Sequence, residues 1–347
     1  SGVHISTNTL KFVIFFHKII FNDNIVFESY NKMFNRTAFK KRILFVGIPD
    51  MAYIGIDGLL MAGVNIVGVL GPKKNHNMYS DFKNFILSRG LNYIEFDELN
   101  EPQLIQKIKE LDIDAAVVCS YNYKIPKQLI EATKDGFINV HPSMLPKYRG
   151  GNPYSRVILN GETETGVTIH FMDEGFDTGD IIAQKPYHIH SKATMGTIFN
   201  ELNFIGIELL LQVLQAYETQ PLPRIPQPKG NFVSGNGLKD KDLFINYEKT
   251  AEEIERFIRG LNPFLLASTT FRGNVMKIMK AEIASDAFCL PHPAGTVAKI
   301  EDDKFFIATS KGLLVPTVMQ FGSFFIVLIV IIFPTFTIVM IHFTFIE

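Results

Sequence analysis

The chain has 347 residues, 47% of them hydrophobic, which is enough for about two domains with sizeable cores. Its 34 Lys and Arg residues are matched by 35 Asp and Glu residues, and this balance excludes a global field that would attract nucleic acid or an acidic membrane. The two cysteines, Cys119 and Cys289, cannot form a disulfide framework and are interpreted as buried thiols of a cytoplasmic protein.

The first 40 residues contain an apolar run, Leu10–Phe21. Lys11, His17 and Lys18 interrupt this run, so it is too short and too charged to span a bilayer. We interpret residues 1–40 as a leader of uncertain status, and we expect the first domain to begin at residue 41.

Strands and helices alternate over the next 80 or so residues. The predicted strands are apolar runs of the kind that buried parallel strands show, namely Arg42–Gly47, Asn65–Leu70, Leu91–Phe96 and Asp114–Cys119. The helical segments between them are Ala52–Ala62, Tyr79–Arg89 and Glu101–Leu111. This alternation predicts an α/β fold with a Rossmann-like, doubly wound and mostly parallel sheet. The turn Gly47–Met51 carries no GxGxxG motif, so we expect no dinucleotide cofactor.

Two polar side chains lie at the end of a further apolar strand, Phe137–Val140. Alternation along a strand places Asn139 and His141 on the same face. Pro142 ends the strand, so the pair lies at its carboxyl end, where open α/β sheets bind their ligands. The loop 120–126 follows the preceding strand and is a candidate pocket wall for the same reason.

An acidic loop that contains Asp177 lies 38 residues beyond Asn139. A helix at about 153–160 and a strand at about 166–172 would bring this loop back beside the Asn139 and His141 pair. From the residues alone, three other acids remain alternatives to Asp177: Asp173, Glu174 and Asp180.

A metal site is the rival hypothesis for this region. Its ligands would be His141, His170, Asp173 and Asp177. Their spacing fits neither an EF-hand loop nor an HExxH helix, so we rank this hypothesis lower and expect no metal.

The clearest helix is Thr194–Ala216, where apolar residues recur at i, i+4 and i+7 and indicate one buried face. It ends a first domain that we predict over residues 41–220. Pro221–Gly230 then holds four prolines, a density typical of an extended, semi-rigid linker. Residues 221–239 are therefore expected to separate two domains.

The second domain is predicted over residues 240–325. Thr250–Glu253 is a capping box that begins a helix extending to about Gly260. The short strands that follow, with turns such as Arg272–Asn274, indicate a small β-barrel. These strands are Ala267–Phe271, Val275–Ile283, Gly295–Ile300, Lys304–Ala308 and Leu313–Val318.

Residues 326–347 form an apolar tail. No Asp, Glu, Lys or Arg occurs between Phe324 and Ile346, a length that would allow a transmembrane helix, and Pro334 does not exclude one. No Lys or Arg cluster flanks the C-terminal end. Two interpretations stay open, a membrane anchor and an artefact of a frame slip in the encoding sequence, and we favour the artefact.

Several separate segments together resemble the signature of folate-dependent formyltransferases. They are Ser143–Pro146, Lys147–Gly151, Glu164–Thr168 and Asp177–Asp180. The similarity covers about residues 42–325 and is greatest to methionyl-tRNA formyltransferases and the related amino-sugar N-formyltransferases. It implies a Rossmann-like catalytic domain followed by an OB-like barrel, with 10-formyltetrahydrofolate as co-substrate. It also implies cofactor contacts from Ser120, Tyr121, Tyr123, Ile125, Ser143, Met144, Leu145 and Pro146.

The resemblance assigns the catalytic roles to Asn139, His141 and Asp177. The Asn139 amide would donate to the formyl oxygen as negative charge develops there. His141 would also donate, if protonated or in the right tautomer. Asp177, at the place of the family's catalytic aspartate, would orient the imidazole and favour its protonated form.

The acceptor amine is less defined by the sequence. The C-terminal domain leads us to expect methionyl-tRNA first, with contacts from local clusters: Lys147 and Arg149, Arg256 and Arg259, Lys277 and Lys280. However, residues 240–320 hold 10 Lys and Arg against 11 Asp and Glu, and the loop 71–77 is short. Both features favour a nucleotide-linked amino sugar as the alternative. A folate-binding protein without transfer activity is a third hypothesis, and a membrane partner is expected only if the tail is native.

Overall fold

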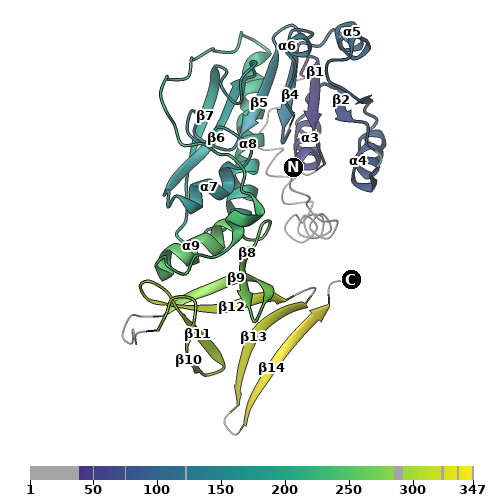
Figure 1. Ribbon diagram of the computed structural model, residues 1–347. Helices are drawn as coiled ribbons and strands as arrows, with labels where there is room; N and C mark the ends of the chain where they lie inside the picture. Colours follow the sequence, from purple (N-terminus) through teal and green to yellow (C-terminus); the bar gives the residue numbers. More distant parts are fainter. Residues whose placement is uncertain are drawn as a thin grey trace. The chain divides into compact units, whose positions relative to one another are not determined.

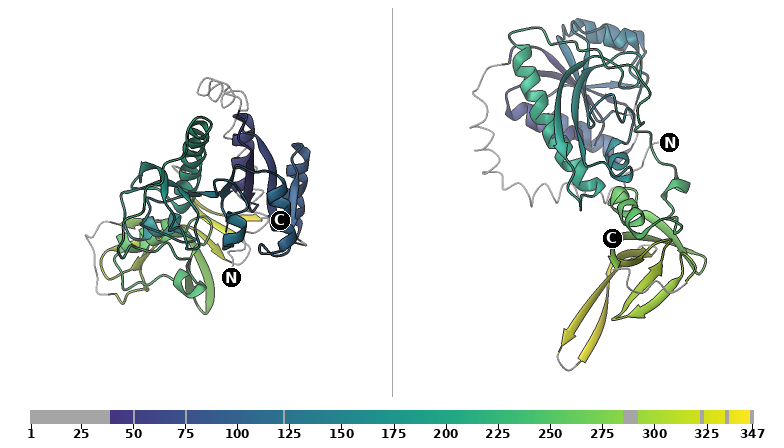
Figure 2. Two further views of the ribbon diagram at one scale, coloured as in Figure 1. Left: turned by 90° about the horizontal axis from the view of Figure 1, so that it is seen from above. Right: turned by 90° about the vertical axis from the view of Figure 1, so that its left-hand side faces the viewer.

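The computed structural model describes residues 39–49, 51–74, 76–121, 123–284 and 292–321, together with the backbone of 324–333 and 336–345 (Figures 1 and 2). The predicted leader lies almost entirely outside the described residues. The chain forms two compact units. The N-terminal unit comprises the residues up to Pro153 together with Glu164–His188 and Asn200–Asn236. The C-terminal unit comprises Tyr154–Thr163, Ile189–Phe199 and the residues from Gly237 onward.

The N-terminal unit is built on a seven-stranded sheet with the order β3-β2-β1-β4-β5-β6-β7. The strands are β1 (Ile43–Gly47), β2 (Ile66–Pro72), β3 (Tyr93–Phe96), β4 (Ala115–Cys119), β5 (Phe137–His141), β6 (Glu164–Phe171) and β7 (Ile181–His188). Neighbouring strands from β3 to β5 pair in parallel, whereas β6 and β7 are added antiparallel. The Rossmann-like α/β class predicted from the alternation is therefore confirmed.

Helices cover both faces of this sheet (Figures 1 and 2). They are α3 (Met51–Met61), α4 (Asn77–Ser88), α5 (Pro102–Glu110), α6 (Lys127–Ile130) and α8 (Met195–Tyr217), which belongs to this unit from Asn200 onward. A further helix, α7 (Pro153–Leu159), belongs to the C-terminal unit except for Pro153. Successive residues of β1 point to opposite faces of the sheet. Leu44 packs in one core with Leu104 of α5 and Leu129 of α6, while Phe45 lies close to Gly55 of α3 on the other.

Helix α8 lies beside α3. A side chain at Gly58 of α3 would come within 3.1 Å of Ile207 in α8, so the absence of a side chain lets the two helices approach closely. By length and hydropathy α8 could cross a membrane, and within the described residues it is the only such helix. Half of its most apolar stretch of 18 residues is buried inside the protein, as in the core helix of a globular fold.

Strand β7 has no counterpart among the elements predicted from the sequence. Its residues include Lys185 and Pro186, which break the apolar run. Pro186 pairs with Gly166 of β6 at the edge of the sheet, where a residue without an N–H group is tolerated. The strand was missed because its stability comes from pairing with β6 and not from its own composition.

The C-terminal unit contains an antiparallel sheet against which α9 packs. Its elements are η1 (Asp240–Leu243), α9 (Ala251–Leu261), β8 (Ala267–Phe271), β9 (Asn274–Ala284), β10 (Val297–Glu301), β11 (Lys304–Ala308), β12 (Leu313–Phe321), β13 (Phe324–Phe333) and β14 (Phe336–Phe345). Thr250 and Glu253 form the predicted capping box. Strands β9 and β12 pair with each other in the middle of the described sheet. No described strand pairing closes this sheet into a barrel, so the barrel stays a prediction.

The apolar tail contributes backbone to this sheet. Strand β13 pairs with β12, and β13 and β14 form an antiparallel hairpin. These residues therefore have strand geometry in the structure, which differs from the helix that their length would allow in a bilayer.

Candidate active site

Strand β5 carries Asn139 and His141 on one face and at its carboxyl end, as the alternation predicts. Both belong to the N-terminal unit, as do the other residues of the site. The antiparallel neighbour β6 sets His170 directly opposite Asn139 and Thr168 opposite His141. The pairing register thus adds a second imidazole to the two polar groups of β5.

Asp177 lies in the loop between β6 and β7, with its backbone in the left-handed region at φ 53°. Its Oδ1 accepts a hydrogen bond from Asn139 Nδ2 at 3.3 Å, and its Oδ2 accepts one from the Gly150 N–H at 2.9 Å. Oδ2 also lies 3.5 Å from His141 Nδ1. The structure therefore brings together the three residues assigned from the sequence.

The tautomer of His141 follows from its contacts. His141 Nε2 lies 3.0 Å from the carbonyl oxygen of Tyr148, which can only accept, so Nε2 carries the proton. Nδ1 of the neutral ring then presents its lone pair towards the Asp177 carboxylate. A proton that arrives at Nδ1 would lie between the ring and Asp177.

His170 has the opposite tautomer. Its Nδ1 donates to the Phe171 carbonyl oxygen at 2.7 Å, so Nε2 is the acceptor and takes a hydrogen bond from Asn139 Nδ2 at 3.1 Å. The same Nε2 lies 3.5 Å from Asp177 Oδ1. Both amide protons of Asn139 are thus directed at protein acceptors, and the longer contact, to Asp177, is the easier one to exchange for a substrate oxygen.

Burial controls the protonation of His141, whose side chain is 5% exposed. Burial lowers the pKa of His141 below its ordinary value, and the negative charge of Asp177 offsets this only in part. The ring is therefore neutral at pH 7. Asp177 favours the imidazolium, as the resemblance implies, but the cost of burying a charge exceeds the attraction to this one carboxylate.

Asp177 stays ionised in the same environment. Burial by itself would raise the pKa of its carboxyl, but its polar partners, among them the N–H of Gly150, hold that pKa well below its usual range. The site therefore contains a carboxylate beside a neutral imidazole with a vacant Nδ1, which together can accept a proton from an attacking amine.

Two of the three competing acids of this loop have other partners. Asp173 Oδ1 accepts from the Gly175 N–H at 2.9 Å and from the Thr178 hydroxyl at 2.6 Å, so it holds the loop together. Glu174 pairs with Lys127 at 3.4 Å on the surface. In the part of the chain that the structure describes, no cluster of His, Cys, Asp and Glu could hold a metal ion.

The residues assigned to the cofactor fall into two groups. The loop after β4 contains Tyr121 and Tyr123, whose ring centroids lie 5.4 Å apart, while Ile125 is buried. The segment 143–146 is largely internal: the Ser143 hydroxyl donates to the Lys147 carbonyl at 2.7 Å, and the Leu145 side chain is buried. The cofactor contacts remain predictions, namely those of Ser120, Tyr121, Tyr123, Ile125, Ser143, Met144, Leu145 and Pro146.

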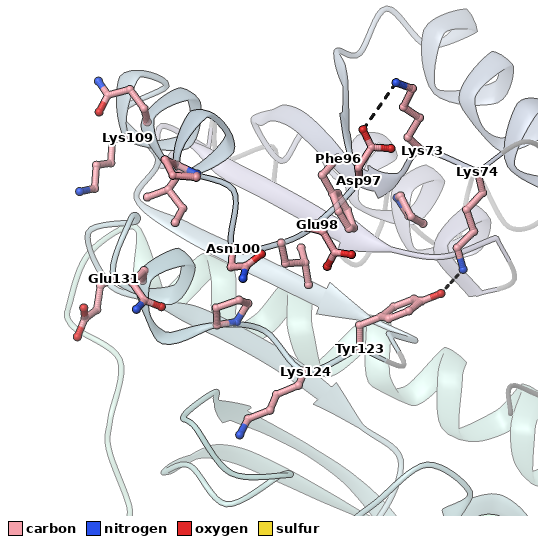
Figure 3. A pocket seen from close by; sticks show the side chains of 17 residues that line it. Lys73, Lys74, Phe96, Asp97, Glu98, Asn100, Lys109, Tyr123, Lys124 and Glu131 are labelled. Atoms are coloured by element: carbon pink, nitrogen blue, oxygen red, sulfur yellow. Dashed lines mark hydrogen bonds and ion pairs between the residues drawn. The ribbon is translucent and has the colours of Figure 1, made fainter.

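A cavity of about 1040 Å³ opens beside the loop after β4 (Figure 3). Residues that follow β2, β3 and β4 line it, among them Lys73, Lys74, Tyr123 and Lys124. The Lys74 ammonium contacts the Tyr123 hydroxyl, and Lys73 pairs with Asp97 (Figure 3). Its lining does not include the three residues predicted to be catalytic.

Sequence reasoning missed two residues of the site. The sequence offers His170 only as a metal ligand, because nothing in it states which residue of β6 faces Asn139. Composition places Gln227 in a linker, yet its Nε2 donates to the carbonyl oxygens of Asp177 and Gly179 at 2.9 and 2.8 Å. The one available signal for His170 was its position in strand alternation with Thr168 and Gly166.

Two family models match separate segments of the chain. The model of the family described as "Formyl transferase" matches residues 65–214, and that of "Formyl transferase, C-terminal domain" matches residues 237–323. A methionyl-tRNA formyltransferase of Symbiobacterium thermophilum is 35% identical over 289 residues, which cover 81% of this chain and 89% of that protein. A methionyl-tRNA formyltransferase of Clostridioides difficile is 33% identical over 79% of this chain and 90% of that protein.

Among solved structures, an N-formyltransferase of Helicobacter canadensis in complex with folinic acid and dTDP-3-aminofucose shares the fold. The TM-score is 0.59 at 22% identity, with coverage of 80% of this chain and 98% of that one. The fold, both domain matches and the extent of the similarity to the bacterial relatives agree, and the chain belongs to the formyl transferase family.

Proposed function

We propose that this enzyme transfers the formyl group of 10-formyltetrahydrofolate to the amino group of methionyl-tRNA, in the cytoplasm. The observation that carries the chemistry is the contact of Asp177 with Asn139, His141 and His170 at the carboxyl end of β5. Similarity to methionyl-tRNA formyltransferases along both units supports the choice of acceptor.

Each group has a separate task in this proposal. The amine attacks the formyl carbon, the bond from that carbon to folate N10 breaks, and the proton lost by the amine ends on N10. Asp177 and the vacant Nδ1 of His141 hold that proton in between. Asn139 turns one N–H from Asp177 Oδ1 to the formyl oxygen as charge develops there. The co-substrate would lie along the loop after β4.

Several of the cations expected to contact tRNA have internal partners. Arg149 donates to Gln227 at 2.6 Å, Arg259 pairs with Glu255 at 2.8 Å, and Lys277 donates to the Ser268 hydroxyl at 2.8 Å. Since phosphate binding requires free cations, this arrangement and the balanced charge favour a small amine as the second candidate. The second candidate acceptor is the amino group of a nucleotide-linked amino sugar.

A direct assay separates the candidates. The protein is incubated with 10-formyltetrahydrofolate and either methionyl-tRNA or a dTDP-linked amino sugar, and release of tetrahydrofolate and formylation of the acceptor are both measured. We expect turnover with methionyl-tRNA that weakens as salt rises. Formylation of the sugar alone would reassign the acceptor, and release of tetrahydrofolate with neither acceptor product would contradict amine transfer.

The cationic contacts can be tested with a matched pair of variants. Lys147 and Lys280 are exposed. The double variant Lys147→Ala/Lys280→Ala should flatten the salt dependence of tRNA binding by about two units of slope, one for each phosphate contact. The exposed Lys192 lies 3.8 Å from Glu255 and serves as the control, with no change of slope expected in Lys192→Ala.

A further inference from the structure

Two carbonyl groups of the loop that carries Asp177 are held by one amide. Gln227 Nε2 donates to the carbonyl oxygen of Asp177 at 2.9 Å and to that of Gly179 at 2.8 Å. Gln227 Oε1 accepts from Arg149 Nη2 at 2.6 Å and from Arg149 Nε at 3.2 Å. These partners fix the orientation of the amide. A flipped amide would place its oxygen against two carbonyl oxygens and its NH2 group against the Arg149 guanidinium.

Gln227 belongs to a segment attached to the active site on both sides. We call Ile225–Gly235 the strap. At one end Ile225 exchanges two backbone hydrogen bonds with Ile181, which begins β7, at 2.8 and 3.0 Å. At the other end the Tyr148 N–H donates to the Val233 carbonyl at 2.6 Å.

The second attachment holds the turn that supplies a hydrogen bond to Asp177. The Gly235 N–H donates to the Arg149 carbonyl, and the Asn152 N–H donates to the Gly235 carbonyl, both at 2.7 Å. Between them lies Gly150, whose N–H binds Asp177 Oδ2. A side chain at Gly235 would come within 2.6 Å of the Tyr148 carbonyl oxygen, so the strap lies directly on this turn.

The Asp177 backbone needs such support. Its φ of 53° is a conformation that residues other than glycine adopt at a cost, and they keep it only where their surroundings enforce it. The carboxylate must at the same time meet Asn139, His141 and Gly150 from three directions. Without Gln227, the loop would be held by the hydrogen bonds of Asp173 to Gly175 and Thr178. The carbonyl groups of Asp177 and Gly179 would then lose the restraint that the Gln227 amide supplies.

We propose that Gln227, oriented by Arg149, is a positioning residue that holds Asp177 in its catalytic conformation, and that the strap is part of the active site. This inference rests on the proposed role of Asp177 in formyl transfer. The segment that composition assigns to a linker therefore acts on the reaction through the Asp177 backbone without touching substrate.

The test is a double-mutant cycle. Gln227→Met keeps the volume of the side chain and removes all of its hydrogen bonds, and Lys229→Met is the control on an exposed residue of the strap. We expect the kcat of Gln227→Met to fall about 30-fold with the KM for 10-formyltetrahydrofolate within about twofold, because a small displacement of a catalytic group costs about 10–100-fold. In an Asp177→Asn background the same change should cost less than about twofold.

Other results would overturn the proposal. An equal loss of kcat in both backgrounds would show a general structural effect, and an unchanged kcat or a rise of KM alone would show that the amide does not act through Asp177. If Gln227→Met does not fold, Arg149→Lys is used in the same cycle, since it keeps the charge and removes the two-pronged grip on Oε1.

A readout without turnover separates this inference from the proposed function. Amide hydrogen exchange of residues 173–180 should become faster in Gln227→Met and stay unchanged in Lys229→Met. Unchanged exchange in both variants would refute the positioning role even if the wild-type enzyme is active. Faster exchange in Gln227→Met, with no formyl transfer by the wild type, would leave the positioning role intact and refute the proposed function.

Discussion

Two regions on the same edge of the N-terminal sheet handle polar groups in opposite ways. At the end of β5, Asn139, His141, His170 and Asp177 are buried or nearly so, and they bind one another. Beyond β2 and β3, the cavity of Figure 3 is bordered by lysines with long side chains, among them Lys73, which is 65% exposed. The first arrangement fixes angles and protonation states, whereas the second offers charge with little fixed geometry.

The difference predicts where substitutions are costly. A buried polar network loses its function when one member changes, because the remaining groups lose both their partner and their orientation. Exposed cations exchange partners with water at little cost. Substitutions in the two regions should therefore differ strongly in their effect on kcat.

Asp177→Asn should give the largest loss. The change removes the negative charge of the carboxylate, which takes part in proton transfer, and keeps the volume of the side chain. We therefore expect kcat to fall by about 10³-fold. Steady-state kinetics with 10-formyltetrahydrofolate measure the effect. Asp173→Asn is the control, because its Oδ1 can still accept from Gly175 and Thr178, and a larger loss in this control would move the role to Asp173.

His141→Gln should lower kcat by about 10²-fold and change its dependence on pH. In the wild type the reaction needs neutral His141, whose pKa is lowered by burial, so kcat should stay constant as pH falls through 6.5 and decline only in more acidic solution. The variant should lack this decline. Exposed His190→Gln serves as the control, and a wild-type kcat that declines above pH 6.5 would contradict a neutral, buried His141.

The lowered pKa of His141 also makes the stability of the folded protein depend on pH. Since the folded protein holds the pKa of His141 below that of the unfolded chain, the unfolded state takes up the proton first as pH falls, and stability decreases below about pH 6.5. Urea unfolding of the wild type between pH 7 and pH 5 should show this decrease. A smaller decrease is expected in His141→Gln, and an identical slope in both proteins would argue against the shift.

His170→Leu should have a moderate effect on both activity and folding. The change removes the acceptor for Asn139 Nδ2 and leaves the Phe171 carbonyl without its donor, which costs about 1–3 kcal/mol of stability. We expect kcat to fall about 10-fold because the Asn139 amide is no longer oriented. Thermal unfolding and kcat are measured on the same preparation, and a loss of stability with full activity would make His170 purely structural.

Lys73→Ala should have the smallest effect. Its pair with Asp97 spans 3.7 Å between exposed side chains, and such pairs contribute about 0–1 kcal/mol. We expect kcat within about twofold of the wild type and little change in unfolding temperature. A fall in kcat comparable to that of His141→Gln would show that the cavity takes part in the chemistry, and the contrast between the two regions would fail.

Most of the strands and helices, and the carboxyl-end position of Asn139 and His141, were predictable from the sequence, because these follow from local periodicity and from the residues that end a strand. Asp177 was found through the resemblance, since spacing alone did not separate it from Asp173, Glu174 and Asp180. Periodicity did not predict the edge strand β7, because this strand contains Pro186 and is stabilised by pairing with β6.

The rest of the site depends on contacts between segments that are distant in the sequence. The register between β5 and β6 placed His170 against Asn139, and register is a property of two strands that neither strand encodes alone. The contact of Gln227 with the Asp177 loop joins residues 50 positions apart in the chain. The protonation of His141 likewise depends on its burial by distant segments, which reverses the direction expected from one neighbouring carboxylate.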